Sequence, residues 1–216
     1  MSDTTDFEKL REDYNGRELD RSDLKTDPFD QFDEWFQNAL DADVHLPDAM
    51  SLATCAPDGQ PTVRTVVLRG HGPEGFRFFT GLNSRKAQHL KQNPRTSLTF
   101  YWKPFHRQVR IEGEVERVPR DDVEEYFATR PRNSQLAAHV SDQQDVVESR
   151  DVLQAELDEA RQRFDGQDVP CPDDWGGFLL KPHCFYFWQG RAGRLHDRFR
   201  YQHSEDDSWT LDRIAP

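Results

Sequence analysis

Short strand-like segments separated by tight turns dominate the chain from Ala49 onward, and they limit the folds that it can adopt. Ala49–Ala56 and Pro61–Arg69 flank the turn Pro57-Asp58-Gly59, a pattern that predicts a β-hairpin. Further strands are predicted at residues 76–80, 96–102, 108–118, 177–188, 194–201 and 209–214. Because most of these segments are joined as hairpins with helices inserted between them, the pattern favours an antiparallel barrel over a doubly wound sheet.

Helical patterns stand before and between these strands. Asp27-Pro28 supplies a capping residue and a first helical position. The apolar stripe that follows consists of Phe29, Phe32, Trp35, Phe36 and Leu40. Other helices are predicted from Ser84 to Asn93 and over 121–130, 134–140 and 146–164, the last with Val147, Leu153 and Leu157 facing inward. We therefore expect a mobile polar segment over 1–27 and one domain over 28–216.

Charge and cysteine content exclude several classes of function. The 216 residues carry 40 acidic and 28 basic side chains, a formal net charge of -12, which disfavours nucleic acid or an anionic membrane as a general partner. Cys55, Cys171 and Cys184 are too scattered for a disulfide framework or a recognisable metal site. With no secretory signal and no long apolar run, we expect a cytoplasmic protein without a metal, whose local basic clusters bind something small.

The most informative of these clusters is Arg194-Leu-His196-Asp-Arg198-Phe. If this stretch is a strand, Arg194, His196 and Arg198 project from one face, about 6.5 Å apart along the chain. Arginine suits phosphate and carboxylate oxygens, and histidine can exchange a proton near neutral pH. The motif predicts a site for an anionic ligand. The alternative is a solvated edge strand with surface ion pairs, which would show the same residue pattern.

Three more stretches carry groups suited to phosphate. In Arg64-Thr-Val-Val-Leu-Arg69 strand alternation directs Arg64 and Arg69 to opposite sides of the sheet, or both cap strand ends. Ser84-Arg85-Lys86 places a capping hydroxyl and two cations at a helix start, where the helix dipole disfavours cations and a bound phosphate would explain them. A chance occurrence of such a pair is the alternative.

The third stretch is Tyr126-Phe-Ala-Thr-Arg130-Pro-Arg-Asn-Ser134. Tyr126 and Arg130 are four residues apart and share a helical face, and Pro131 ends the helix so that Ser134 can converge with them on one oxyanion. Tyrosine and arginine on helix faces are mostly structural, so each cluster is weak alone. Together the clusters predict two phosphate-type sites, as a phosphorylated cofactor with a phosphorylated substrate would need.

The order of these motifs resembles the pyridoxine (pyridoxamine) 5′-phosphate oxidase family from about Leu10 to Pro216. The motifs in register are Arg64-x4-Arg69, Phe79-Thr80, Ser84-Arg85-Lys86, Arg107-Gln108-Val109, Tyr126-Phe, Arg130-Pro-Arg-x-Ser134-Gln, Gly176-Gly-Phe, Phe187-Trp188-Gln-Gly, Arg194-Leu-His196-Asp-Arg198-Phe and Asp212-Arg-Ile-Ala-Pro216. The resemblance implies an α+β, mainly β fold, a Greek-key split β-barrel that binds FMN at the interface of a homodimer.

The resemblance also implies roles for individual residues. It assigns FMN contacts to Arg64, Thr65, Val66, Val67, Leu68, Arg69, Phe79, Thr80, Arg85, Lys86, Gln108, Gln143, Gln144, Trp188 and Arg198. It assigns substrate binding to Arg11, Tyr14, Arg69, Tyr126, Arg130, Ser134, Arg194 and His196, with Arg194 and His196 as the catalytic pair over the pyridine ring and Arg11 and Tyr14 in an N-terminal lid. Arg69 stands where the family usually has Lys, and Gln144 where it usually has Ser.

The implied activity is oxidation of pyridoxamine or pyridoxine 5′-phosphate to pyridoxal 5′-phosphate, a step of vitamin B6 synthesis. Hydride would pass from C4′ of the substrate to FMN, and dioxygen would reoxidise the flavin and give hydrogen peroxide. The alternative is a flavin- or pyridoxal-phosphate-binding module, or a flavin reductase, without this turnover. A second phosphate site favours the oxidase, because a protein that binds only flavin has no use for one.

Overall fold

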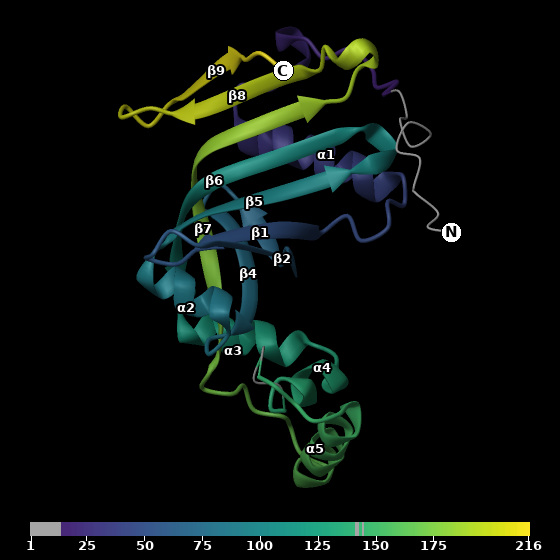
Figure 1. Ribbon diagram of the computed structural model, residues 1–216, viewed down its shortest axis with the longest axis vertical. Helices are drawn as coiled ribbons and strands as arrows, with labels where there is room; N and C mark the ends of the chain where they lie inside the picture. Colours follow the sequence, from purple (N-terminus) through teal and green to yellow (C-terminus); the bar gives the residue numbers. More distant parts are fainter. Residues whose placement is uncertain (1–13, 141–142, 144) are drawn as a thin grey trace, which may run out of the picture. The chain divides into compact units, whose positions relative to one another are not determined.

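The computed structural model describes residues 14–140, 143 and 145–216 (Figure 1). The helices are α1 (Pro28–Asp41), α2 (Arg85–Gln92), α3 (Arg120–Thr129), α4 (Arg132–Ala137) and α5 (Arg150–Arg163), with short 3-10 turns η1 (Arg21–Asp23), η2 (Lys103–Phe105) and η3 (Ala192–Arg194). The strands are β1 (Ala49–Cys55), β2 (Pro61–Val67), β3 (Gly70–Gly72), β4 (Gly75–Gly81), β5 (Arg95–Trp102), β6 (Arg107–Arg117), β7 (Trp175–Gln189), β8 (Asp197–His203) and β9 (Trp209–Arg213). None of the described helices is both long and apolar enough to cross a membrane.

The strands form one nine-stranded sheet in the order β2-β1-β5-β6-β7-β4-β3, with β8 paired to β7 and β9 paired to β8. The β1–β2 hairpin is antiparallel with Leu52 opposite Arg64, and β4 pairs antiparallel with β7, with Phe78 opposite Phe178. The predicted antiparallel sheet with added helices is therefore confirmed.

Most predicted elements agree with the structure to within a few residues, and the differences have local causes. Asp27 caps α1, since its side chain accepts a hydrogen bond from the Phe29 backbone N–H at 2.7 Å. The last predicted helix begins at Arg150 instead of Val146, and Val147 lies before it and is exposed. The helix predicted over 134–140 covers Arg132–Ala137, because Pro131 lies at its N-cap. The short strand β3 was not predicted, since its two glycines carry no strand signal.

The chain divides into two compact units, and residues of β5, β6 and β7 belong to both. One unit comprises residues up to Pro47, Thr99–Ile111 and His183–Pro216. Its core is aromatic: Phe32 meets Phe100 edge to face at 5.2 Å, and Trp35 meets Phe187 at 5.1 Å. This packing confirms that α1 contributes core residues.

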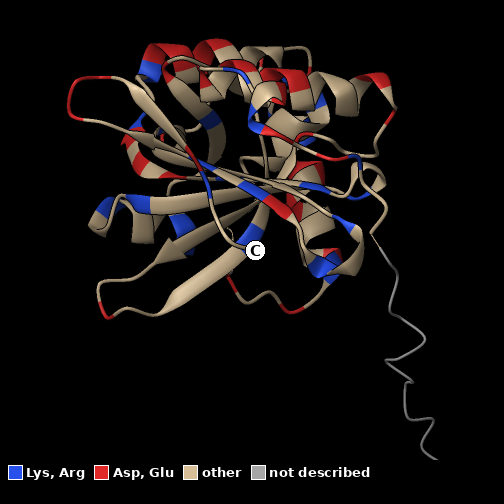
Figure 2. Cartoon of the chain, turned by 90° about the horizontal axis from the view of Figure 1, so that it is seen from above, with Lys and Arg blue, Asp and Glu red and all other residues tan. Residues whose placement is uncertain are grey.

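The other unit comprises Asp48–Leu98 and Glu112–Pro182. Its helical part is held by a cluster of buried side chains from α3, α4, α5 and β7, which includes Phe127, Leu136, Phe164 and Trp175. Acidic residues colour much of the helical ribbon red in Figure 2, but α2 contains none. The cations of α2 therefore have no carboxylate on their own helix.

Gly113 of β6 gives a test of packing in this unit. A Cβ at this position would lie 2.1 Å from the Lys181 carbonyl oxygen of β7, a contact with backbone that no rotamer change relieves. We expect Gly113→Ala to lower the free energy of unfolding by about 1–3 kcal/mol, measured by chemical denaturation. Gly72→Ala is the matched control, because a Cβ there meets nothing within 4 Å. Equal stability of the two variants would contradict this account of the β6–β7 contact.

Candidate active site

A cavity of about 590 Å³ lies in the unit that contains α2 and α3. The end of β2, the strand β4, the helix α2 and the α3–α4 corner supply its walls. Its lining is Thr65, Val66, Val67, Arg69, Phe79, Thr80, Lys86, Tyr126, Thr129, Arg130, Pro131, Ser134, Gln143 and Trp175. Residues predicted separately for a cofactor and for a substrate phosphate thus share one cavity.

Lys86 of α2 and Thr80 of β4 form a polar group on the cavity wall. The Lys86 Nζ donates to Thr80 Oγ1 at 2.8 Å and to Gln143 Oε1. Burial, with the nearby cation of Arg64 as a second cause, lowers the pKa of Lys86 to about 8. Burial and the Arg85 cation likewise lower the pKa of Arg64. The three cations repel one another, and within the described part of the chain no carboxylate is paired with Lys86 or Arg64, so the cluster fits an anion.

Arg130 forms a second cationic position at the α3–α4 corner. Its guanidinium lies over the Trp175 ring at 4.6 Å, and its Nη1 is buried and has no hydrogen-bond partner in the structure. Burial lowers the pKa of Arg130, and the Arg69 cation lowers it further, against the raising effects of Tyr126 and Cys171. A buried donor without a partner is costly, and a bound phosphate oxygen would satisfy it.

Stacked rings hold this corner in place. Phe79 of β4 stacks on Tyr126 at 4.1 Å and on Trp175 at 5.3 Å, with interplanar angles of 11° and 3°. Tyr126, Arg130 and Ser134, which the sequence predicts to converge on one oxyanion, all line this cavity. The sequence prediction did not include Trp175 among the site residues. The available signal was the adjacent Gly176-Gly177 pair, which indicates close packing at this point of the chain. A Cβ on Gly177 would lie 2.8 Å from the Phe79 ring.

Several other predicted residues of this unit lie outside the cavity lining. Arg64 donates to Leu52 O at 3.1 Å and to Thr54 Oγ1 at 2.7 Å, along the β1–β2 pair. Leu68 is buried. The Ser84 hydroxyl was predicted to cap α2 but donates to the Gly81 carbonyl at 2.7 Å instead. Arg85 lies within 3.4 Å of His89 on the same helix.

Arg69 is held differently from the other cations. It lies beyond the end of β2, and its Nη1 pairs with Asp48 Oδ2 at 3.0 Å. Asp48 was not predicted as a partner, because the two residues are distant in sequence and only the β1–β2 pairing brings them together. The planar guanidinium can bind Asp48 with one edge and a ligand with another, which a Lys at this position could not do in the same way.

The Arg194–Arg198 stretch and Tyr14 lie in the other unit. The strand predicted over 194–201 is present but covers Asp197–His203, so its predicted start at Arg194 is wrong. Gly193 and Arg194 have φ of 68° and 62°, so they form a left-handed turn, and β8 begins only at Asp197. Arg194, His196 and Arg198 therefore do not project from one strand face. The sequence alternation concealed this turn because a non-glycine residue rarely adopts positive φ.

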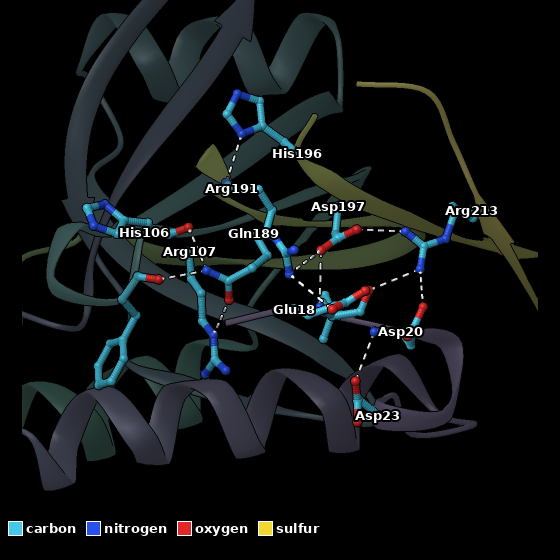
Figure 3. A network of polar contacts seen from close by, with 12 residues as sticks. Glu18, Asp20, Asp23, His106, Arg107, Gln189, Arg191, His196, Asp197 and Arg213 are labelled. Atoms are coloured by element: carbon cyan, nitrogen blue, oxygen red, sulfur yellow. Dashed lines mark hydrogen bonds and ion pairs between the residues drawn. The ribbon is translucent and has the colours of Figure 1, made fainter. Parts of the chain in front are cut away.

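His196 is oriented by the backbone of this turn. Its Nδ1 accepts a hydrogen bond from the Arg191 N–H at 3.1 Å (Figure 3), so in the neutral ring the proton lies on Nε2. Burial and the Arg194 cation lower the pKa of His196, and Asp197 partly offsets them. Trp188 lies 4.9 Å from the His196 ring. Near neutral pH, His196 is therefore an uncharged donor through Nε2.

The remaining predicted residues of this unit are placed separately. Arg198 donates from Nη1 to the Ala215 carbonyl at 3.0 Å, and Gln108 lies in β6 and is half-buried. Tyr14 packs edge to face against His196 at 5.2 Å. Arg11 and Gln144 lie outside the described residues.

Comparison with known proteins places this architecture in a class. The solved structure of PhzG from Burkholderia lata in complex with tetrahydrophenazine-1-carboxylic acid superposes with a TM-score of 0.87 at 26% identity, over 94% of this chain and all of that one. A pyridoxamine 5′-phosphate oxidase-related, FMN binding protein from Nostoc punctiforme superposes at 0.72 with 17% identity, over 89% and 100%. The fold is that of the FMN-binding split-barrel proteins.

The family follows from sequence. The model of pyridoxamine 5′-phosphate oxidase matches residues 36–164, and that of the pyridoxine 5′-phosphate oxidase C-terminal dimerisation region matches residues 175–216. Proteins named pyridoxine/pyridoxamine 5′-phosphate oxidase are 44% identical in Rippkaea orientalis, over 98% of this chain and 100% of the relative, and 47% identical in Salinibacter ruber, over 96% and 97%. The chain belongs to the pyridoxamine 5′-phosphate oxidase family, which confirms the resemblance drawn from its motifs and, with it, FMN as the expected cofactor.

Proposed function

We propose that the protein is an FMN-dependent oxidase that converts pyridoxamine 5′-phosphate or pyridoxine 5′-phosphate to pyridoxal 5′-phosphate. The observation that carries the proposal is the cavity in which Lys86 and Arg130 both lie without a paired carboxylate in the described part of the chain. Two uncompensated cationic positions in one cavity suit two phosphate-bearing ligands, and family membership supports assigning one to the cofactor and the other to the substrate.

FMN fits the residues present. Lys86, Thr80 and Gln143 form one hydrogen-bonded group on the cavity wall, next to the Arg64 and Arg85 cations. These residues would hold the FMN phosphate through charge-assisted hydrogen bonds. When bound, FMN supplies hydride acceptance from C4′ of the substrate and reoxidation by dioxygen, with hydrogen peroxide as the product.

The remaining groups bind and orient the substrate. Arg130, Tyr126, Ser134 and Arg69 would bind its phosphate, since all four line the cavity. Positioning by remote phosphate contacts lowers the entropic part of the barrier to reaction. His196, neutral and protonated on Nε2, would donate a hydrogen bond to a polar substituent of the ring, and Arg194 would add positive charge beside it.

The proposal predicts a yellow homodimer with about one FMN per chain. Dimerisation is supported by the C-terminal dimerisation region that residues 175–216 match and by the frequency of twofold oligomers. Anaerobic addition of pyridoxamine 5′-phosphate should bleach the flavin absorbance, and air should restore it with one peroxide per pyridoxal 5′-phosphate formed. A yellow protein that neither bleaches nor makes peroxide would instead be a flavin-binding module. A colourless monomer that does not bind added FMN would overturn the proposed function.

A further inference from the structure

A single half-buried carboxylate, Asp197, joins three separate parts of its unit (Figure 3). Its Oδ1 accepts from Arg213 Nη1 at 2.7 Å, and its Oδ2 accepts from the Leu19 backbone N–H at 3.1 Å. Arg191 Nη1 lies 3.7 Å from the same Oδ2. Only 13% of the Asp197 side chain is exposed, so these contacts are less screened than those of an ordinary surface ion pair.

The first part held by this carboxylate is the segment Tyr14–Asp20. Arg213 reinforces it, since its Nη2 donates to the Leu19 carbonyl at 3.1 Å and to Asp20 Oδ1 at 2.6 Å. Leu19 itself is buried. The backbone of the segment is therefore fixed at Leu19 from both its N–H and its carbonyl side.

The other end of the segment packs without spare room against the end of β7. A Cβ on Gly16 would lie 2.3 Å from the Gly190 carbonyl oxygen, and one on Gly190 would lie 2.8 Å from the Tyr14 ring. Asn15 Oδ1 is 3.0 Å from His106 Nε2. This close fit directs Tyr14 into a cage formed by the rings of His106, Trp188 and His196, at 5.3, 5.4 and 5.2 Å.

The second part is the turn from Arg191 to His196. The Arg191 N–H fixes the His196 ring through Nδ1, while the Arg191 side chain lies near both Glu18 and Asp197. The third part is the C-terminal strand β9, which contributes Arg213. Asp197 is thus hydrogen-bonded to the segment that carries Tyr14. It also lies beside Arg191, the residue whose backbone orients the His196 ring.

We propose that Asp197 is a positioning residue, which holds the segment Tyr14–Asp20 and the turn 191–196 in one arrangement so that Tyr14 rests against His196. The inference rests on the proposed function, because it assigns a place in turnover to His196. Asp197 acts through these neighbours.

The same carboxylate sets the charge around the His196 ring. Burial and the Arg194 cation lower the pKa of His196, and the Asp197 carboxylate raises it. Arg191 bonds the ring through its backbone N–H, and its side chain lies near Glu18 and Asp197. The aromatic rings of Tyr14 and Trp188 also contact His196. Removal of the Asp197 charge therefore lowers the pKa of His196 further, in addition to loosening the segment.

The decisive variant is Asp197→Asn, tested on the FMN-loaded protein by two independent measurements. Trypsin cleavage after the exposed Arg17, followed by mass spectrometry, should become about 10-fold faster, because the segment loses charge-assisted contacts. In the pH profile of kcat/KM for pyridoxamine 5′-phosphate, the midpoint of the acid limb should move to lower pH, with FMN content unchanged. A merely structural role for Asp197 would not move that midpoint.

Asp212→Asn is the matched control. Asp212 also pairs with an arginine, Arg200 at 2.8 Å, but within the described residues it pairs neither with the segment nor with His196. Unchanged cleavage and an unchanged acid limb in Asp197→Asn, or equal effects in the control, would overturn the inference. If Asp197→Asn does not fold, Arg213→Gln tests the same tether: it should speed cleavage after Arg17 and leave the acid limb in place, and unchanged cleavage would count against the tether. Because cleavage does not depend on turnover, failure of the proposed oxidase activity alone would be recognised separately.

Discussion

Replacement of Arg130 by Met is expected to lower kcat/KM for pyridoxamine 5′-phosphate by about 10²- to 10⁴-fold while FMN stays bound. The guanidinium lines the cavity, lies over Trp175 at 4.6 Å and has a buried Nη1 without a partner. Two charge-assisted hydrogen bonds to phosphate, at about 1.5–3 kcal/mol each, account for an effect of this size. Steady-state kinetics and flavin absorbance of the purified variant measure both quantities.

Two controls separate phosphate binding from a general disturbance of the site. Pyridoxamine without the phosphate should be turned over with similar kcat/KM by wild type and Arg130→Met, because the lost group has nothing to bind. Arg161→Met removes an exposed arginine of α5 that pairs only with Asp158 in the described structure, and it should have no effect on either substrate. Equal losses for phosphorylated and unphosphorylated pyridoxamine would show that Arg130 acts through the fold instead.

How far the sequence predicts this molecule depends on the range of the interactions involved. The β1–β2 hairpin and the capped start of α1 follow from local patterns, because turn and cap residues act within a few positions of the chain. Tyr126, Arg130 and Ser134 were also within local reach, since one helical turn and Pro131 bring them together. The pairing of Arg69 with Asp48 was not, because it depends on strand register.

The turn before β8 shows a different limit. Arg194, His196 and Arg198 alternate as strand residues do, yet positive φ at Gly193 and Arg194 delays the strand until Asp197. The backbone there is fixed by contacts from remote parts of the unit, such as the Leu19 N–H on Asp197. Tertiary contacts of this kind override local propensity, and they are also why Asp197 passed unnoticed in the sequence although it stands inside the most informative motif.

The role of Lys86 predicts a pH dependence of cofactor binding whose sign follows from its lowered pKa. With a pKa of about 8 in the FMN-free protein, the ammonium is present at pH 7 and is lost as the pH rises through 8. The flavin phosphate is already doubly charged above about pH 6. FMN affinity should therefore be constant between roughly pH 6.5 and 7.5 and fall by up to tenfold per pH unit above 8.

Lys86→Met should lower the affinity for FMN and abolish its pH dependence. Loss of one charged hydrogen bond, about 1.5–3 kcal/mol, corresponds to a 10- to 150-fold weaker FMN complex at pH 7, and the decline above pH 8 should vanish because no titrating cation remains. Titration of the FMN-free protein by flavin fluorescence measures this, with Lys91→Met as the matched control on the exposed side of α2. Riboflavin, which lacks the phosphate, should bind wild type and Lys86→Met alike at every pH. A Lys86→Met protein that still loses FMN affinity above pH 8 would assign the titration to a different group, and the phosphate to a different part of the cavity.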